Sequence, residues 1–292
     1  MRVRYSFSSR RTRHIDKIRK QRQKYPSLAE KIVAISDIIL QVLDARFIQD
    51  TRNLELEKTI QNQKKKIIFV LNKADLINKN KIKKKELEEI KPYVFVSATK
   101  RTGSKDLRNL IKTLAKQVEK IESRTLKGDK IKDKGGEEQI VVGVIGYPNT
   151  GKSTLINLLI GKSSAGTGAE AGFTKGIQKL KLAKDIILLD SPGVIPQKEY
   201  SGTKQKAIAK HTKVSGRSYS QVKNPEQIIA ELIKEYSKTF DKHYKIKSKA
   251  NAEILIEELG RKKGFLKKAG EINEDKTARF ILKEWQEGKI KI

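Results

Sequence analysis

The residues best suited to chemistry lie in one run, Gly146-Tyr147-Pro148-Asn149-Thr150-Gly151-Lys152-Ser153-Thr154. An apolar run (140–145) precedes it and another (155–160) follows, so it is predicted to join a buried strand to a buried helix. Glycines in such a turn let successive backbone N–H groups point at one anion, and the helix N-terminus adds roughly half a positive charge. The pattern predicts a phosphate-binding loop.

Each polar residue of this loop has an expected task. Lys152 is predicted to reach the β- and γ-phosphates of a nucleotide, and Ser153 to place its hydroxyl on Mg²⁺. The remaining predicted nucleotide-binding residues of the run are Asn149, Thr150, Gly151 and Thr154. The alternative is a glycine-rich strand-to-helix turn in which Lys-Ser occurs by chance.

A second polar group, Asn72-Lys73-Ala74-Asp75, ends the apolar run 67–71 and predicts which base is bound. The Asp75 carboxylate can accept two hydrogen bonds from the ring N–H and the exocyclic amine of guanine, a donor pair that adenine lacks. Asn72 is predicted to brace the loop and contact the ring, and the stem of Lys73 to cover the base face. A polar turn after a strand is the structural alternative.

Three further polar segments are expected at the same site. Ser97-Ala98-Thr99 follows the short apolar run 93–96, and the Ala98 N–H could meet the guanine carbonyl. Asp190-Ser191-Pro192-Gly193 follows the run 186–189, where Asp190 could hold Mg²⁺ through water and Gly193 could contact the γ-phosphate. Thr174 lies in a glycine-rich segment between the phosphate loop and Asp190, and it is the predicted switch residue for Mg²⁺ and the γ-phosphate.

The order of these segments is unusual, because both guanine-reading segments precede the phosphate loop. In this order, and in Asp44-Ala45-Arg46 and Arg52-Asn53, the chain resembles the YlqF/RbgA family of circularly permuted, ribosome-assembly GTPases over nearly its whole length. The resemblance implies GTP and GDP as ligands, Mg²⁺, K⁺ held by Asn149, and a ribosomal subunit as partner, the large one favoured. Capping of the loop by Asn149 is the alternative to a K⁺ site.

The resemblance also implies GTP hydrolysis, with Lys152, Thr174 and Gly193 as the predicted catalytic residues. Ras-like enzymes position the attacking water with a Gln after the D-x-x-G motif, but here that position holds Val194. We therefore expect slow turnover by the isolated protein and stimulation by a bound partner. His14 is the only His in the N-terminal segment, and its neighbours do not match the family motif for a replacement.

The alternation of apolar runs with helical spacing predicts an α/β fold with a mostly parallel sheet and helices on both faces. We expect a basic N-terminal arm (1–24), a circularly permuted P-loop GTPase domain (25–197) and a small all-helical, basic C-terminal domain (198–292). Residues of about 123–138 are predicted to be a flexible linker, where a permuted fold must join its former termini. Helices are expected over 225–234, 252–259 and 275–286, with Trp285 in the core.

Composition indicates the class of partner. The 292 residues include 65 Lys and Arg against 34 Asp and Glu, a net charge of +31, which favours a polyanion. We expect the arm and the C-terminal domain to contact rRNA, solvated charged surfaces being the alternative. There is no Cys, which excludes disulfides and thiolate chemistry. No apolar run reaches the length of a membrane span, and no apolar region follows the basic N-terminus, so we expect a cytoplasmic protein without stable membrane association. The sequence leaves the oligomeric state open, with a monomer as the default expectation.

Two other functions fit the same residues. One is an RNA chaperone that binds GTP and hardly hydrolyses it, and the other is a GTPase that acts on tRNA or a membrane surface. Stimulated hydrolysis separates the first from an assembly GTPase, and co-sedimentation with ribosomal particles, tRNA or vesicles separates the second.

Overall fold

The computed structural model describes residues 27–118, 125–126, 129–130, 139–161, 177–196, 205–268 and 270–292. The predicted N-terminal arm and the predicted switch residue Thr174 lie outside these ranges. So does most of the predicted linker, in which only the strands β4 (Thr125–Leu126) and β5 (Asp129–Lys130) are described, paired antiparallel.

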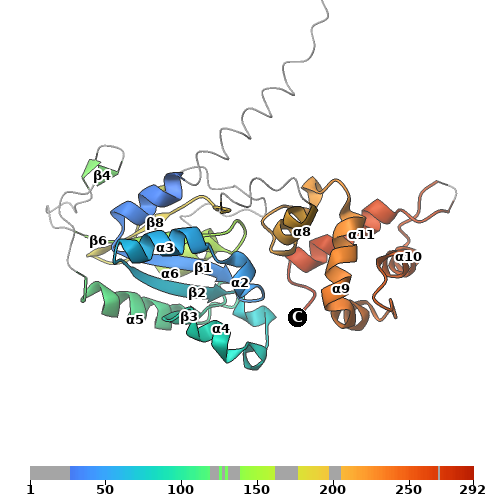
Figure 1. The fold of residues 1–292 in the computed structure, drawn as a ribbon, viewed down its shortest axis with the longest axis horizontal. Coiled ribbons are helices and arrows are strands. Elements are labelled where there is room, and N and C mark those ends of the chain that lie inside the picture. The colour runs from blue at the N-terminus through green and yellow to red at the C-terminus, as the bar shows by residue number, and fades with distance from the viewer. Residues whose placement is uncertain are drawn as a thin grey trace, which may run out of the picture.

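A six-stranded sheet forms the centre of the N-terminal part, in the order β3-β2-β1-β6-β8-β7 (Figure 1). Its strands are β1 (Ile38–Asp44), β2 (Lys66–Asn72), β3 (Tyr93–Phe95), β6 (Ile140–Gly146), β7 (Gln178–Lys181) and β8 (Ile186–Asp190). All neighbours are parallel except β7 and β8. Every residue of β1, β6 and β8 is buried, as expected for parallel strands covered on both faces.

Alternate residues of β1 point into two different cores. Ile38, Leu40 and Val42 pack with α5 (Ser104–Ala115) and α6 (Lys152–Ile160). Ile39 packs on the other face with helical residues 27–35 and with α3 (Leu54–Asn62). The short helices α2 (Ile48–Thr51) and α4 (Lys84–Glu88) belong to a further cluster around Leu43. Figure 1 shows α3 and α5 on opposite sides of the sheet, so the predicted fold class is confirmed.

The C-terminal part is helical and lies beside one end of the sheet (Figure 1). It contains α8 (Gln205–Lys213), α9 (Pro225–Tyr244), α10 (Ala252–Lys263) and α11 (Glu274–Gln286), with a short 3-10 turn, η3, at Tyr219–Gln221. The helix predicted over 225–234 continues to Tyr244, with non-helical backbone angles at Tyr236. The continuation was missed because Tyr, Lys and His dominate its second half, whose buried residues are only Phe240 and Tyr244.

Trp285 is the centre of the C-terminal core and is fully buried, as predicted. Its ring lies 5.4 Å from the ring of Phe240 and 5.9 Å from the ring of Phe47, which follows β1. Tyr147 of the phosphate-loop segment belongs to the same core. The helical part is therefore packed directly against the polar end of the sheet. None of the helices in the described ranges is long and apolar enough to cross a membrane.

Candidate functional site

The polar segments meet at the carboxyl edge of the sheet, where the strand order changes direction between β1 and β6. Asp44, Asn72, Gly146 and Asp190 are the last residues of four of its parallel strands. Parallel α/β folds place ligand sites at this position, because the loops leave neighbouring strands in opposite directions and open a crevice. Four segments far apart in sequence are thus brought to one edge.

The phosphate-loop segment leads from β6 into α6, as the sequence predicts. Lys152 is 6% exposed, and its ammonium donates to the backbone oxygens of Gly146 and Tyr147 at 3.1 and 2.7 Å. Burial lowers the pKa of Lys152 to about 8, although the negative charge of Asp190 opposes this effect. The ammonium is therefore held inside the loop, in an environment that favours its neutral form more than water does.

Asn72 ties the two predicted nucleotide loops together. The side-chain nitrogen of Asn72 donates to the backbone oxygen of Thr150 at 2.8 Å, and its side-chain oxygen accepts from the Ala98 N–H at 3.2 Å. Gly151 has a φ of 90°, and a Cβ there would lie 2.3 Å from the Asn72 nitrogen. A glycine is needed for this close approach. The Ala98 N–H that we expected at a guanine carbonyl is thus used within the protein.

Asp75 is held by Ser97, which was itself predicted to bind the nucleotide. The Ser97 hydroxyl donates to Asp75 Oδ1 at 2.6 Å and accepts from the Lys100 N–H at 3.0 Å. Ser97 is 1% exposed. The carboxylate predicted to read guanine is therefore oriented by a buried hydroxyl group from the neighbouring loop.

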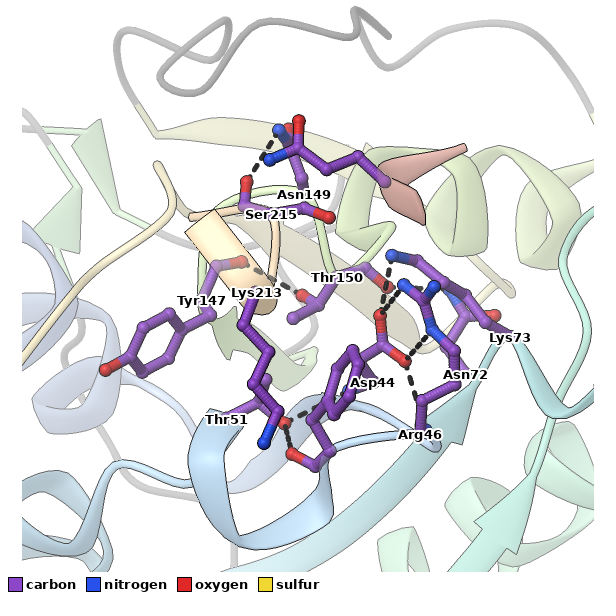
Figure 2. Close-up of polar contacts among 12 residues, drawn as sticks. Asp44, Arg46, Thr51, Asn72, Lys73, Tyr147, Asn149, Thr150, Lys213 and Ser215 are labelled. Atoms are coloured by element: carbon purple, nitrogen blue, oxygen red, sulfur yellow. Dashed lines mark hydrogen bonds and ion pairs between the residues drawn. The ribbon is translucent and has the colours of Figure 1, made fainter. Parts of the chain in front are cut away.

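Asp44 is the most heavily paired carboxylate at this edge (Figure 2). It is fully buried and accepts from Lys73 Nζ at 2.7 Å and from the guanidinium of Arg46 at 2.8 and 3.0 Å. Burial disfavours the carboxylate form, but the charges of Lys73 and Arg46 outweigh it and hold the pKa of Asp44 well below its usual range. Arg46 also donates to the Trp285 oxygen at 3.0 Å, which joins this group to α11.

Ser153 and Asp190, the two predicted Mg²⁺ ligands within the described ranges, lie side by side. The Ser153 hydroxyl donates to Asp190 Oδ2 at 3.0 Å. The other oxygen, Oδ1, is buried and has no hydrogen-bond partner among the described residues. Burial raises the pKa of Asp190, an effect that Lys152 and Ser153 oppose. A hydroxyl and a buried, incompletely paired carboxylate form an oxygen donor set that suits a hard cation such as Mg²⁺.

Gly193 and Val194 follow β8 and pass close to the phosphate loop. A Cβ on Gly193 would lie 2.6 Å from the Pro148 Cα atom, so only glycine fits without a shift. The Val194 N–H donates to the Gly146 oxygen at 3.1 Å. Its side chain is 3% exposed and packs in the core with helical residues 27–35 and α3. Val194 therefore turns away from the site as well as lacking a polar group.

A cavity of about 690 Å³ lies between these loops and the C-terminal helices. The predicted residues that line it are Asn72, Lys73, Asp75, Ala98, Thr99, Asn149, Gly151 and Thr154. Sequence reasoning missed the opposite wall, formed by Ser215, Ser218, Tyr219, Ser220, Lys283, Gln286 and Glu287. These residues belong to no motif, and the cavity brings together parts of the chain more than 60 residues apart, so the sequence carried no signal for this wall.

The C-terminal wall is joined to the phosphate loop by a direct contact. The side-chain nitrogen of Asn149 donates to the backbone carbonyl oxygen of Ser215 at 3.0 Å (Figure 2). Asn149, the residue predicted to hold K⁺, has a left-handed backbone with a φ of 58°. The side-chain amide of Asn149 is thus oriented by the helical part of the protein.

Comparisons with known proteins agree with this geometry. Residues 141–257 match the family model described as 50S ribosome-binding GTPase. The chain is 38% identical over 90% of its length to an uncharacterized GTP-binding protein of Methanocaldococcus jannaschii, of which it covers 65%. It is 33% identical over 89% of its length to nucleolar GTP-binding protein 2 of Yarrowia lipolytica, covering 48% of that protein. It is 30% identical over 94% of its length to nuclear GTP-binding protein NUG1 of Saccharomyces cerevisiae, covering 56%.

The chain therefore spans about half to two-thirds of the length of these curated relatives. Two solved structures of YlqF share its fold. The GDP-bound structure has a TM-score of 0.60 with 22% identity and covers 89% of this chain and 94% of its own. The GNP-bound structure from T. maritima has a TM-score of 0.59 with 22% identity and covers 91% and 94%.

Proposed function

We propose that this chain, a circularly permuted GTPase of the YlqF-like group, binds guanine nucleotides in the cavity at the sheet edge and hydrolyses GTP during assembly of a ribosomal subunit. The observation that carries the proposal is the bracing by Asn72, which holds the Asp75 loop, the Ser97 loop and the phosphate loop around one cavity.

In this proposal Asp75 accepts the two guanine donors while Ser97 fixes its orientation. Lys73 and the loop residues Ala98 and Thr99 border the base. The phosphates take the N-terminal end of α6, and the Lys152 ammonium exchanges its loop carbonyls for phosphate oxygens. The phosphate-binding residues are Asn149, Thr150, Gly151, Lys152, Ser153, Thr154 and Gly193.

Mg²⁺ would be held by Ser153 and, through water, by Asp190, with Thr174 as the third ligand from outside the described ranges. When bound, the ion neutralises charge on the β- and γ-phosphates. The pairing of Ser153 with Asp190 and the incompletely paired Oδ1 atom support this assignment. K⁺ beside Asn149 belongs to the same proposal, and the left-handed backbone of Asn149 and its contact with Ser215 hold the amide in one orientation.

Hydrolysis would be in-line attack of water on the γ-phosphate, helped by Lys152, Thr174 and Gly193 through positioning and charge stabilisation. The buried Val194 side chain supplies nothing to the water. We therefore propose that a ribosomal particle completes the site. Complementing partners raise the rate by roughly 10³- to 10⁵-fold in other GTPases.

The proposed partner is rRNA within the large ribosomal subunit. The matching family, described as 50S ribosome-binding GTPase, supports this choice over other polyanions, and the net charge of +31 supports a nucleic-acid partner. The contacts are assigned to the basic arm (1–24) and to the C-terminal domain (198–292), and the protein is proposed to act as a monomer.

The test is GTP hydrolysis in K⁺ and in Na⁺, with and without each purified ribosomal subunit. We expect slow turnover alone and strong stimulation by the large subunit, greater in K⁺. Rapid turnover by the isolated protein would contradict completion of the site by a partner. Binding of GTP without stimulation by either subunit would favour the RNA chaperone, and stimulation by tRNA or vesicles would favour the remaining alternative.

Base recognition has its own test. Asp75→Asn replaces an acceptor by a donor, so preference should shift from guanine to xanthine nucleotides, measured by competition against a fluorescent nucleotide. An unaltered preference for guanine would remove Asp75 from its assigned role.

A further inference from the structure

Ser215, between α8 and η3, has a buried hydroxyl group that nothing in the fold explains. The residue is 3% exposed, and its hydroxyl oxygen has no hydrogen-bond partner among the described residues. Leaving a polar group buried without a partner costs about 1–3 kcal/mol, and such groups are rare in native proteins. A buried hydroxyl group without a partner in the described part of the protein is therefore a candidate for binding a ligand.

The backbone of Ser215 is also in an unusual conformation. Its φ is 61°, in the left-handed region that residues other than Gly and Asn seldom adopt. Outliers of this kind cluster at ligand-binding sites, where surrounding contacts hold them in place. Here the backbone carbonyl oxygen of Ser215 accepts from the Asn149 side chain, and the Ser215 N–H donates to the backbone oxygen of Thr212 at 3.1 Å.

The segment around Ser215 is held from a second side by α11. Gln286 donates from its side-chain amide to the oxygens of Thr212 and Arg217, both at 2.9 Å. Trp285 donates to the Lys213 oxygen at 3.0 Å. Ser215 is therefore a rigidly placed residue, and a preorganised polar group binds a ligand without losing conformational entropy at that moment.

The place of Ser215 indicates the ligand. It lines the 690 Å³ cavity beside Asn149 of the phosphate loop, while Asp75, which is assigned to the base, lines the same cavity from another loop. We propose that the Ser215 hydroxyl binds a ribose or phosphate oxygen of the guanine nucleotide, so that the C-terminal helical part supplies a nucleotide ligand. This inference rests on the proposed function.

A second contact places the end of α11 against the base-reading loop. Gly288 is buried with a φ of 74°, and a Cβ there would lie 2.4 Å from the Leu76 Cδ1 atom. Leu76 directly follows Asp75 and also lines the cavity. The C-terminal part thus touches both the phosphate loop, through Ser215, and the base loop, through Gly288, and a nucleotide bound between them would stabilise these contacts.

The experiment measures GDP affinity with a fluorescent GDP analogue for the full chain and for Ser215→Gly, since Gly accepts a φ of 61° without strain. We expect the dissociation constant to rise about threefold to tenfold, the effect of one net hydrogen bond. The matched control is Lys249→Gly, which replaces another residue at positive φ that does not line the cavity and should leave affinity unchanged.

The outcomes separate this inference from the function on which it rests. If the unaltered chain binds no guanine nucleotide, the proposed function and the inference both fail. If it binds GDP and Ser215→Gly binds equally well, the inference alone is overturned. Should Ser215→Gly fold poorly, hydrogen exchange on the unaltered chain decides: GDP should slow exchange of the amides at 215–217, and unchanged exchange there would overturn the inference.

Discussion

Lys73 Nζ donates to Asp44 Oδ2 at 2.7 Å, so the lysine of the base-reading loop is bound by the carboxylate that ends the neighbouring strand β1. The same carboxylate binds Arg46, whose guanidinium reaches the Trp285 oxygen in α11. One buried charge therefore connects the proposed guanine site to the C-terminal helices. This contact of the Lys73 ammonium is additional to the prediction for its stem, which was expected to cover the base, and Lys73 lines the cavity proposed to hold that base.

Asp44→Asn should strongly destabilise the protein. The substitution leaves the Arg46 and Lys73 cations without their buried counter-charge, a change that costs about 3–5 kcal/mol when one member of a buried ion pair is removed. Urea unfolding followed by circular dichroism measures the loss. Asp50→Asn is the control, because the Asp50 pair with Lys213 at 3.2 Å is partly exposed and should contribute about 0–1 kcal/mol. Equal effects from the two variants would contradict the proposed importance of the buried group.

The lowered pKa of Asp44 predicts how the stability of the protein changes at acidic pH. Because its pKa is lower in the folded than in the unfolded protein, its contribution to stability is fully present above the unfolded value near 4 and is lost as pH falls through the folded value. The stability difference between the unaltered chain and Asp44→Asn should therefore be constant from about pH 5 to pH 7 and shrink below pH 4. A difference that grew on acidification would contradict the sign of this shift.

Nucleotide affinity should depend on the charge of Lys152. Its pKa is lowered to about 8, so raising the pH from 7 to 9 removes the proton from most molecules of the free protein. If phosphate requires the ammonium form, affinity for GDP should fall by up to about tenfold over this range, since one pH unit above the pKa leaves about one molecule in ten protonated. Calorimetry near pH 8 in buffers of different ionisation enthalpy should also show proton uptake on binding. Constant affinity with no proton uptake would refute the prediction.

The same shift makes the Lys152 ammonium destabilising at neutral pH, whereas the Asp44 carboxylate is stabilising there. Lys152 has a lower pKa when folded than when unfolded, so its penalty is fully present below pH 8 and is relieved as pH rises toward 10.5. Lys152→Met removes the buried charge and should therefore raise the free energy of unfolding at pH 7 while abolishing nucleotide binding. Unfolding in urea at pH 7 and pH 9.5 measures the change in stability. The difference in free energy of unfolding between the variant and the unaltered chain should be smaller at pH 9.5.

Ser97→Ala should weaken base discrimination without affecting the fold. Its hydroxyl donates to Asp75 at 2.6 Å, and without it the carboxylate can rotate away from the orientation that reads guanine. We expect GDP affinity to fall up to about tenfold and the preference for GDP over ADP to narrow. Ser104→Ala, at the start of α5, is a nearby serine control. Equal preference for GDP in Ser97→Ala and the unaltered chain would show that Asp75 needs no such support.

Removal of magnesium tests the pair at the end of β8. The unaltered chain should bind GDP more tightly in Mg²⁺ than in EDTA. Ser153→Ala should lose most of this increase while keeping the affinity measured in EDTA, because its hydroxyl is assigned to the metal rather than to the base. An increase with Mg²⁺ that survives Ser153→Ala would exclude Ser153 as a ligand.

The sequence by itself determined the fold class and where the polar segments lie. The apolar runs before Asn72, Gly146 and Asp190 predicted buried strands, and polar residues at the ends of parallel strands meet at one edge. The order of the motifs along the chain was enough to predict permutation. Local pattern succeeded here because a strand, a glycine-containing turn and a helix are encoded within about 20 consecutive residues.

Only the tertiary structure decided how these segments are braced. Asp44 binding Lys73, Ser97 binding Asp75, and Asn149 binding Ser215 are contacts between residues 22 to 66 positions apart, and no periodicity records them. The C-terminal wall of the cavity depends on how α11 packs around Trp285 against Phe47. Such packing arises from the shapes of many apolar side chains at once, so which polar groups it brings together becomes visible only in the folded molecule.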